Sequence, residues 1–179
     1  MDYAVFLTQL GWMTVAGSDC GVAAVTLPSS SMVDSLDRLC RKARVAPAAM
    51  REVRPEAFGT LPDRLAACMR GEIVPLEDRI DRSRWTDFRS RIWDATRLIP
   101  YGESRSYSWV AARAGQPRAC RAAGQALHHN PVPILVPCHR VIGADGGLTG
   151  FGDRLELKRL LLSMESEALA ASSDSERRV

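Results

Sequence analysis

The chain has 179 residues, of which 46% are hydrophobic and 25% charged, and its formal net charge is +3. These values are typical of one ordinary globular domain, or of two small domains that share a core, and they exclude a collagen, a coiled coil and a disordered tail protein. No apolar run approaches the roughly 20 residues of a membrane span, and no basic residue precedes the first apolar stretch, so we expect neither a membrane helix nor a signal peptide.

Three short apolar segments open the chain, at residues 3–7, 12–16 and 21–27. They are rich in Val, Thr and aromatic residues, which favour strands. Gly17-Ser18-Asp19 separates the second segment from the third, as a turn would. The pattern therefore predicts a small antiparallel meander.

Helices are predicted after these strands. Ser31 with Asp34 three positions later resembles a capping box, which indicates a helix over about residues 31–44. A second helix is predicted over residues 62–70. A charge-dense stretch follows, and we place there the end of an N-terminal α/β domain, residues 1–84.

The second half of the chain is predicted to be mostly helical. Residues 86–99 carry apolar side chains at helical spacing, and residues 106–114 form a short helix that ends at Gly115. Pro117 is well placed as the first residue of a helix that runs to about His128. Two helices joined by so tight a turn predict a helix-turn-helix.

The last helix is expected to begin near Asp153, with Glu156 three positions on. A C-terminal domain of residues 85–167 would then precede a flexible tail of residues 168–179. The fold class is α+β, with a small antiparallel sheet and helices in the first domain and a mostly helical second domain that contains the helix-turn-helix.

Five cysteines are dispersed along the chain without CxxC spacing: Cys20, Cys40, Cys68, Cys120 and Cys138. We therefore expect reduced thiols in a cytoplasmic protein rather than a disulfide scaffold or a zinc ribbon. The first three are interpreted as small core residues.

Positive charge gathers in one window. Residues 104–144 contain no Asp or Glu but carry Arg105, Arg113, Arg118, Arg121 and Arg140. On a helical wheel of residues 117–129, the apolar side holds Cys120, Ala123 and Leu127, and the other side holds Arg118, Arg121, Ala122, Gln125 and His129. This pattern fits a helix that enters a nucleic-acid groove, and it also fits an amphipathic surface helix with two incidental arginines.

Cys138 lies between Pro137 and His139. A cysteine attacks as the thiolate and needs a nearby base or cation. Side chains of neighbouring residues diverge in an extended chain, so His139 would reach Cys138 only through a local turn or a water molecule. Glu165 is a candidate to orient the imidazole. The alternative is an inert buried cysteine and a solvated glutamate.

Five motifs follow one another in the second half: Ile99-Pro100-Tyr101-Gly102 to Ser106-Tyr107, Arg121-Ala122-Ala123-Gly124, Asn130-Pro131-Val132-Pro133-Ile134, Pro137-Cys138-His139-Arg140-Val141, and Leu157-Lys158 to Leu161-Leu162 with Glu165. Their order and spacing resemble those of the O6-alkylguanine-DNA alkyltransferase family. The resemblance covers residues 88–165, whereas the N-terminal half matches only in its pattern of strands followed by helices.

This resemblance implies a DNA-repair protein that irreversibly moves a methyl or alkyl group from guanine O6 to Cys138. His139 would act as base through a water molecule, and Glu165 would orient it. Tyr107 would donate to the guanine as negative charge develops. The thioether product is stable, so we expect one turnover per molecule, no cofactor and no metal.

The resemblance also implies how DNA is held. The damaged base would be flipped out of the duplex, Arg121 would fill the vacated space, and Asn130 would hold the hinge between recognition helix and active-site strand. Other DNA contacts would come from Arg118, Ala122 and Gln125. The guanine pocket would be completed by Pro133, Val141, Phe151 and Gly152. The expected partner is double-stranded DNA containing O6-alkylguanine, bound by a monomer that has no membrane contact.

The sequence departs from the family pattern at two places. Asp153-Arg154 stands where family members commonly have small residues, and the N-terminal half has no histidine to match the zinc ligands of some relatives. Non-catalytic relatives have tryptophan at the acceptor position, so Cys138 argues against a non-catalytic role.

Two other functions remain as alternatives. A helix-turn-helix DNA-binding protein with a structural cysteine is the first, and a Cys–His acyl hydrolase is the second.

Overall fold

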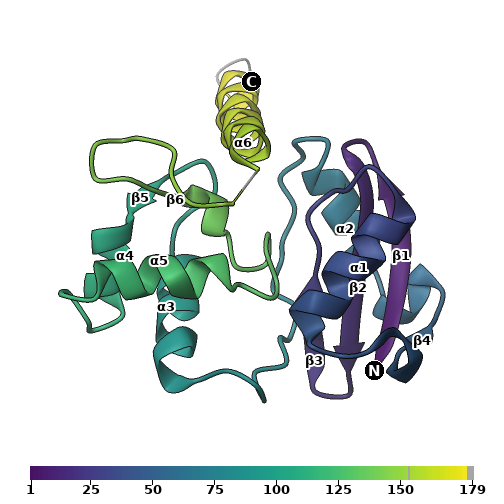
Figure 1. Cartoon of the computed structure of the whole chain (residues 1–179). Coiled ribbons are helices and arrows are strands. Elements are labelled where there is room, and N and C mark those ends of the chain that lie inside the picture. The colour runs from purple at the N-terminus through teal and green to yellow at the C-terminus, as the bar shows by residue number, and fades with distance from the viewer. Residues whose placement is uncertain (153, 177–179) are drawn as a thin grey trace. The chain divides into compact units, whose positions relative to one another are not determined.

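The computed structural model describes residues 1–152 and 154–176, and it divides into two compact units. Unit 1 consists of Met1–Met69, Val74–Trp85 and Pro131–Leu135, and unit 2 of Arg70–Ile73, Thr86–Asn130 and the described part of Val136–Val179 (Figure 1). The main boundary thus lies between Trp85 and Thr86.

Two short segments belong to a different unit from the one that we expected. Pro131–Leu135 belongs to unit 1, where the backbone N–H of Val25 donates to the carbonyl of Pro131 (2.9 Å). Arg70–Ile73 belongs to unit 2, where Gly71 lies against Met164. Neither assignment was predicted, because both depend on contacts between residues far apart in the chain.

A four-stranded sheet forms the centre of unit 1. The strands are β1 (Asp2–Thr8), β2 (Gly11–Ser18), β3 (Gly21–Val25) and β4 (Arg51–Glu52), in the order β3-β2-β1-β4. The first three pair antiparallel, which confirms the predicted meander. The fourth pairs parallel to β1, so the sheet is mixed rather than purely antiparallel. Two residues carry too little pattern for this strand to be recognised in the sequence.

Two helices complete unit 1, α1 (Met32–Ala43) and α2 (Leu61–Cys68). Helix α1 begins as predicted, because the Ser31 hydroxyl accepts from the Asp34 backbone N–H (3.1 Å). Short 3₁₀ turns at Pro47–Ala49 and Pro55–Phe58 were not predicted.

A buried network of hydroxyl groups joins α1 to the sheet. The Thr26 hydroxyl lies 3.0 Å from that of Thr14 and 2.9 Å from that of Ser35. All three side chains are fully buried, so each polar group is satisfied by another instead of by water.

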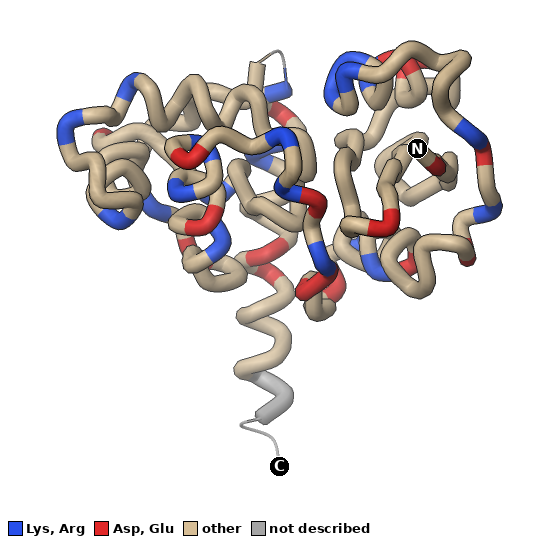
Figure 2. Tube along the Cα trace, turned by 90° about the horizontal axis from the view of Figure 1, so that it is seen from below, with Lys and Arg blue, Asp and Glu red and all other residues tan. Residues whose placement is uncertain are grey.

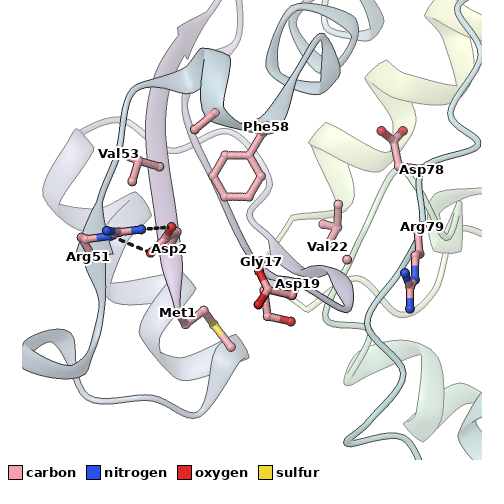
Figure 3. A pocket seen from close by; sticks show the side chains of 13 residues that line it. Met1, Asp2, Gly17, Asp19, Val22, Arg51, Val53, Phe58, Asp78 and Arg79 are labelled. Carbon is pink, nitrogen blue, oxygen red and sulfur yellow. Dashed lines mark hydrogen bonds and ion pairs between the residues drawn. The ribbon is translucent and has the colours of Figure 1, made fainter.

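Unit 1 also has a pocket of ≈ 520 Å³ beside the first residues of β1 and the β2–β3 turn (Figure 3). The ring of Phe58 points into it, and an ion pair between Arg51 and Asp2 lies at one side. None of its lining residues was predicted as a site residue.

Unit 2 is mostly helical. Its helices are α3 (Asp87–Arg97), α4 (Tyr107–Arg113), α5 (Cys120–His128) and α6 (Leu155–Glu176). A two-residue strand β5 (Arg105–Ser106) pairs parallel with β6 (Val141–Ile142). Helix α4 begins where the Ser106 hydroxyl accepts from the Trp109 backbone N–H (3.1 Å). The predicted helices and the helix-turn-helix of α4 and α5 are present.

Two details of α5 differ from the prediction. The helix begins at Cys120 and not at Pro117, because the backbone N–H of Ala119 donates to the carbonyl of Gln116 (2.9 Å) and closes a turn first. Cys120 was predicted to be buried but is exposed, and the buried residues of α5 are Ala123, Ala126 and Leu127. The other cysteines also differ: Cys20 is exposed and Cys40 and Cys68 are only partly buried.

Helix α6 is longer than expected. It continues through Glu176 rather than ending at residue 167, and Leu169 packs against Gly102, which supplies a tertiary contact for the additional turns. Its last turns project from the rest of unit 2 (Figure 2). The predicted start at Asp153 lies outside the described residues. No helix in the described part of the chain is long and apolar enough to cross a membrane.

Candidate active site

Cys138 lies in a tight double turn of unit 2. Pro137, with φ −77° and ψ 64°, forms an inverse γ-turn in which the backbone N–H of Cys138 donates to the carbonyl of Val136 (2.7 Å). A 3₁₀ turn, Cys138–Arg140, follows directly. The cysteine is buried, with 8% of its surface exposed. The sequence predicts this turn only in part, because proline has a suitable φ but its ψ is set by the packing around it.

The side-chain amide of Asn130 anchors this turn. Its Nδ2 donates to the carbonyl of Val136 (2.9 Å) and to the Sγ of Cys138 (3.2 Å). Asn130 lies two residues after the end of α5 and is 2% exposed. The amide therefore connects the end of the recognition helix to the thiol, at the hinge position that the resemblance implies.

His139 and Glu165 form a buried pair. The Nε2 of His139 lies 2.8 Å from the Oε1 of Glu165, although 26 residues separate them in the chain. Because a carboxylate only accepts, Nε2 carries the proton and Nδ1 has the free lone pair. That Nδ1 is buried and has no hydrogen-bond partner among the described residues. The histidine is thus oriented with one nitrogen available as a base.

Glu165 is held from three directions. Besides His139, the backbone N–H of Gly102 donates to its Oε2 (2.9 Å), and the guanidinium of Arg140 donates through Nε to Oε2 and through Nη2 to Oε1, both at 2.9 Å. The third donor of Arg140, Nη1, reaches the carbonyl of Ile99 (2.9 Å). The loop that contains Gly102, the turn Cys138–Arg140 and α6 therefore meet at one carboxylate. The sequence analysis counted Arg140 in the positively charged window and in the motif around Cys138 but gave it no role in the site, because its partner lies 25 residues away.

Burial and charge set the protonation of this pair. Burial lowers the pKa of His139, and the nearby charges of Arg140 and Lys158 lower it further, whereas Glu165 raises it. Burial raises the pKa of Glu165, but the hydrogen bonds from His139 and Arg140 outweigh this effect and bring the pKa to about 2. The resting pair is therefore a neutral imidazole beside a carboxylate.

Tyr107 and Lys158 converge on the loop after β6. The Tyr107 hydroxyl donates to the carbonyl of Thr149 (3.0 Å). The Nζ of Lys158 donates to the same carbonyl (2.7 Å) and to the carbonyl of Val141 (2.5 Å). Burial raises the pKa of Tyr107 and lowers that of Lys158 to about 8.

Sequence reasoning assigned no role to Lys158. A signal was present, since Lys158 shares one face of α6 with Leu161 and Glu165 at spacings of three and seven residues, and all three are buried. A buried lysine on an apolar helical face requires partners, which the two carbonyls supply.

Four of the five predicted DNA-binding residues are exposed. Arg121, Ala122 and Gln125 are exposed on α5, and Arg118 is exposed in the turn before it, whereas Asn130 is buried. Figure 2 shows Lys and Arg at several points along unit 2.

The predicted pocket residues are divided between the units. Val141, Phe151 and Gly152 belong to unit 2 and Pro133 to unit 1. Phe151 has a φ of +71° between Gly150 and Gly152, which also have positive φ values, and left-handed backbone at a phenylalanine is uncommon. The Tyr107 hydroxyl lies so close to Gly150 that a side chain at this position would collide with it.

Together, the thiol of Cys138, the imidazole of His139 and the carboxylate of Glu165 form an arrangement suited to nucleophilic chemistry. The acid–base pair can receive a proton, and the amide of Asn130 can stabilise a thiolate by donating to it. Among the described residues, no group of three or more His, Cys, Asp or Glu side chains is placed to hold a metal ion.

Comparison with known proteins identifies relatives over almost the whole chain. Residues 87–167 match the family model described as 6-O-methylguanine DNA methyltransferase, DNA binding domain. A methylated-DNA–protein-cysteine methyltransferase from Mycolicibacterium paratuberculosis is 38% identical over 172 residues, 96% of each chain. A protein of the same name from Methanosarcina acetivorans is 35% identical over 92% of this chain and 98% of its own. A crystal structure of Mycobacterium tuberculosis OGT in complex with DNA matches with a TM-score of 0.76 at 34% identity, covering 94% of each chain.

Proposed function

Since the chain belongs to the methylated-DNA–protein-cysteine methyltransferase family, and so performs direct-reversal DNA repair by moving an alkyl group from guanine O6 to a cysteine, we propose that Cys138 is the acceptor. The observation that carries this assignment is the buried thiol held by Asn130 beside the His139–Glu165 pair. The other cysteines, Cys20, Cys40, Cys68 and Cys120, are exposed or only partly buried.

The transfer is an in-line displacement at the alkyl carbon. A bond forms between the Sγ of Cys138 and that carbon, and the bond between the carbon and guanine O6 breaks with its electron pair left on the guanine. The thiol proton passes through a water molecule to Nδ1 of His139, the nitrogen that has no partner among the described residues. Glu165 holds Nε2–H and stabilises the imidazolium that forms.

Tyr107 supports the leaving guanine. As negative charge develops on the purine, its hydroxyl donates a hydrogen bond and then a proton, which restores neutral guanine. The tyrosinate then takes a proton from solvent, and the His139 imidazolium releases the former thiol proton to solvent. In this structure the hydroxyl donates to the carbonyl of Thr149. Binding of the base therefore requires Tyr107 to exchange that carbonyl for the guanine, while Lys158 keeps Thr149 hydrogen-bonded.

The partner is duplex DNA that contains O6-alkylguanine. A stacked base is out of reach of a buried thiol, so it must be flipped, which costs a few kcal/mol. The exposed face of α5 is placed to contact DNA, with Arg121 entering the stack and Arg118, Ala122 and Gln125 beside it. Within unit 2, Val141, Phe151 and Gly152 would line the guanine pocket.

The reaction ends after one turnover. Water does not break the carbon–sulfur bond of an unactivated thioether, so the alkylated Cys138 is not regenerated. We propose a monomer that acts without a cofactor, in the cytoplasm, where it has access to chromosomal DNA.

The test is the intact mass of the protein after incubation with a duplex that carries one O6-methylguanine. We expect a gain of about 14 Da, because a methyl group replaces the thiol hydrogen and the net addition is CH₂, located on the peptide that contains Cys138. Cys138→Ser should bind the duplex and gain no mass, whereas Cys120→Ser, at the exposed start of α5, should gain it as the wild type does. A methyl group on another residue, or transfer by Cys138→Ser, would refute the assignment.

The same experiment tests the alternative of a helix-turn-helix protein with a structural cysteine, which the exposed α5 surface would also allow. That function predicts binding of the duplex with no gain of mass in the wild type.

A further inference from the structure

Arg140 places a positive charge directly against the proton-accepting pair. Its Nε and Nη2 both donate to the carboxylate of Glu165, and its Nη1 donates to the carbonyl of Ile99. Its side chain is 13% exposed, so water screens this charge only weakly. All three donor groups are used inside unit 2, and the guanidinium stands over the ring of Tyr101 at 5.3 Å.

Three charged groups act on the His139 ring. Glu165 and Lys158 come from α6, and Arg140 comes from the 3₁₀ turn Cys138–Arg140, which also carries the thiol of Cys138. Only Glu165 attracts a proton to the ring in the resting state, when Cys138 is a thiol. Arg140 opposes it in two ways, by repelling the imidazolium and by taking two of the hydrogen bonds that the carboxylate accepts.

We propose that Arg140 is a positioning residue for the alkyl transfer: its charge balances Glu165 and so keeps His139 neutral, with Nδ1 free, until the thiol proton arrives. The proposal rests on the function proposed above, because a base is needed only if Cys138 must lose a proton. It goes beyond that function by assigning the balance of charge to a residue that contacts neither the thiol nor the substrate.

The count of charges supports this role. With Arg140 present, a neutral His139 leaves the carboxylate paired with the guanidinium, and the buried cluster has no net charge from these groups. Without Arg140, the buried carboxylate of Glu165 would lose the cation to which it is hydrogen-bonded, because the ammonium of Lys158 donates to the carbonyls of Val141 and Thr149 instead. An unpaired buried carboxylate is costly unless a proton binds. The His139–Glu165 pair would then take a proton from solvent, and Nδ1 would already be occupied when substrate binds.

The direct test is a pH titration of ¹⁵N-labelled histidine side chains by NMR. The chain has only three histidines, and His128 and His129 are exposed on the last turn of α5 and just after it, so they serve as internal references. In the wild type we expect His139 to remain neutral, protonated on Nε2, to a pH below the ordinary histidine pKa of 6.5. A wild-type His139 that takes up a proton together with the two references would overturn the proposal, whether or not any variant folds.

Variants separate charge from structure. In Arg140→Gln the pair should bind a proton within the range from pH 5 to 8, whereas Arg140→Lys, which keeps the charge, should titrate as the wild type. Equal titration of His139 in Arg140→Gln and wild type would overturn the proposal. A titration of Arg140→Lys that matches Arg140→Gln would also overturn it, because the effect would then come from the shape of the guanidinium.

The consequence for repair is a change in pH dependence. With free O6-methylguanine base as substrate, the methyl-transfer rate of Arg140→Gln relative to the wild type should be about tenfold lower at pH 6 than at pH 8. The reason is that the unprotonated fraction of a base falls tenfold for each pH unit below its pKa. Parallel pH profiles for variant and wild type would contradict the role of Arg140 but not the proposed function. A wild type that transfers no methyl group from duplex or free base would instead contradict the proposed function.

Discussion

The amide of Asn130 donates to the sulfur of Cys138 across 3.2 Å while its other hydrogen bond goes to the carbonyl of Val136, two residues before the cysteine. One side chain thus shapes the turn that presents the thiol and is placed to stabilise a thiolate. Because Asn130 lies two residues after the end of α5, it also connects the proposed DNA-contacting helix to the proposed acceptor within a single unit.

Removing that amide should slow the chemistry. A hydrogen bond to a charged group contributes about 1.5–3 kcal/mol, so we expect Asn130→Ala to transfer methyl groups about 10- to 100-fold more slowly. Single-turnover kinetics with free O6-methylguanine base measures this without DNA binding. Circular dichroism of the variant serves as the folding control, and an unchanged rate would show that the contact with sulfur has no role in the reaction.

Acid should destabilise the protein through Glu165. Its pKa of about 2 lies below the ordinary 4.5, so the folded state releases this proton more readily than the unfolded state. The resulting stability, about 3 kcal/mol, is complete above pH 4.5 and is lost as the pH falls towards 2. His139, whose pKa is also lowered, adds a loss that begins below about pH 6.5.

Urea unfolding between pH 2 and pH 7 measures this dependence. Glu165→Gln should start from a lower stability at pH 7 and should lose less of it between pH 4.5 and pH 2 than the wild type does. Parallel curves for the two proteins would mean that another carboxylate is responsible.

Arg121 should matter for duplex DNA and not for the chemical step. We expect Arg121→Ala to slow repair of a duplex about tenfold or more, because the flipped state loses the side chain that fills the stack. Its rate with free O6-methylguanine base should stay within twofold of wild type. Arg113→Ala, on the exposed side of α4, is the matched control for lost charge. Equal losses on both substrates would argue against a wedge.

Lys158→Met should destabilise unit 2. Methionine fills a similar volume, but the carbonyls of Val141 and Thr149 lose a donor, and each unsatisfied buried group costs about 1–3 kcal/mol. The loss should appear as a lower urea midpoint with an unchanged slope. Lys42→Met, at the chain's other lysine in α1, should change the midpoint by much less. Equal shifts would show that the buried lysine adds nothing specific.

Local signals predicted most of the helices and strands. Ser31 and Ser106 accept hydrogen bonds from backbone N–H groups three residues later, and such caps can be recognised from neighbouring residues alone. Pro117 misled the prediction because its preference for the first helical position is only statistical, and a turn closed by Ala119 displaces the start of α5. The short strand β4 has no local signal, since its pairing depends on β1, about 50 residues earlier.

Some residues of the candidate site could be found from the sequence, and others only from the structure. Motif order pointed to Cys138, His139 and Glu165, and the structure brings His139 and Glu165 to hydrogen-bonding distance. Arg140 and Lys158 acquire their importance only through partners 25 and 17 residues away, Glu165 and Val141. A charged residue in a sequence does not show whether it faces water or a buried carbonyl.

The sequence by itself determined the helices and their caps, the three-stranded meander, the helix-turn-helix and the position of the acceptor motif, because each depends on the order of neighbouring residues. Only the tertiary structure decided which unit contains the segment Pro131–Leu135, how far α6 extends, and which side chains share the carboxylate of Glu165. Those features arise from burial and hydrogen bonding between distant residues. The same long-range contacts set the pKa of His139 and hence the base that the proposed transfer requires.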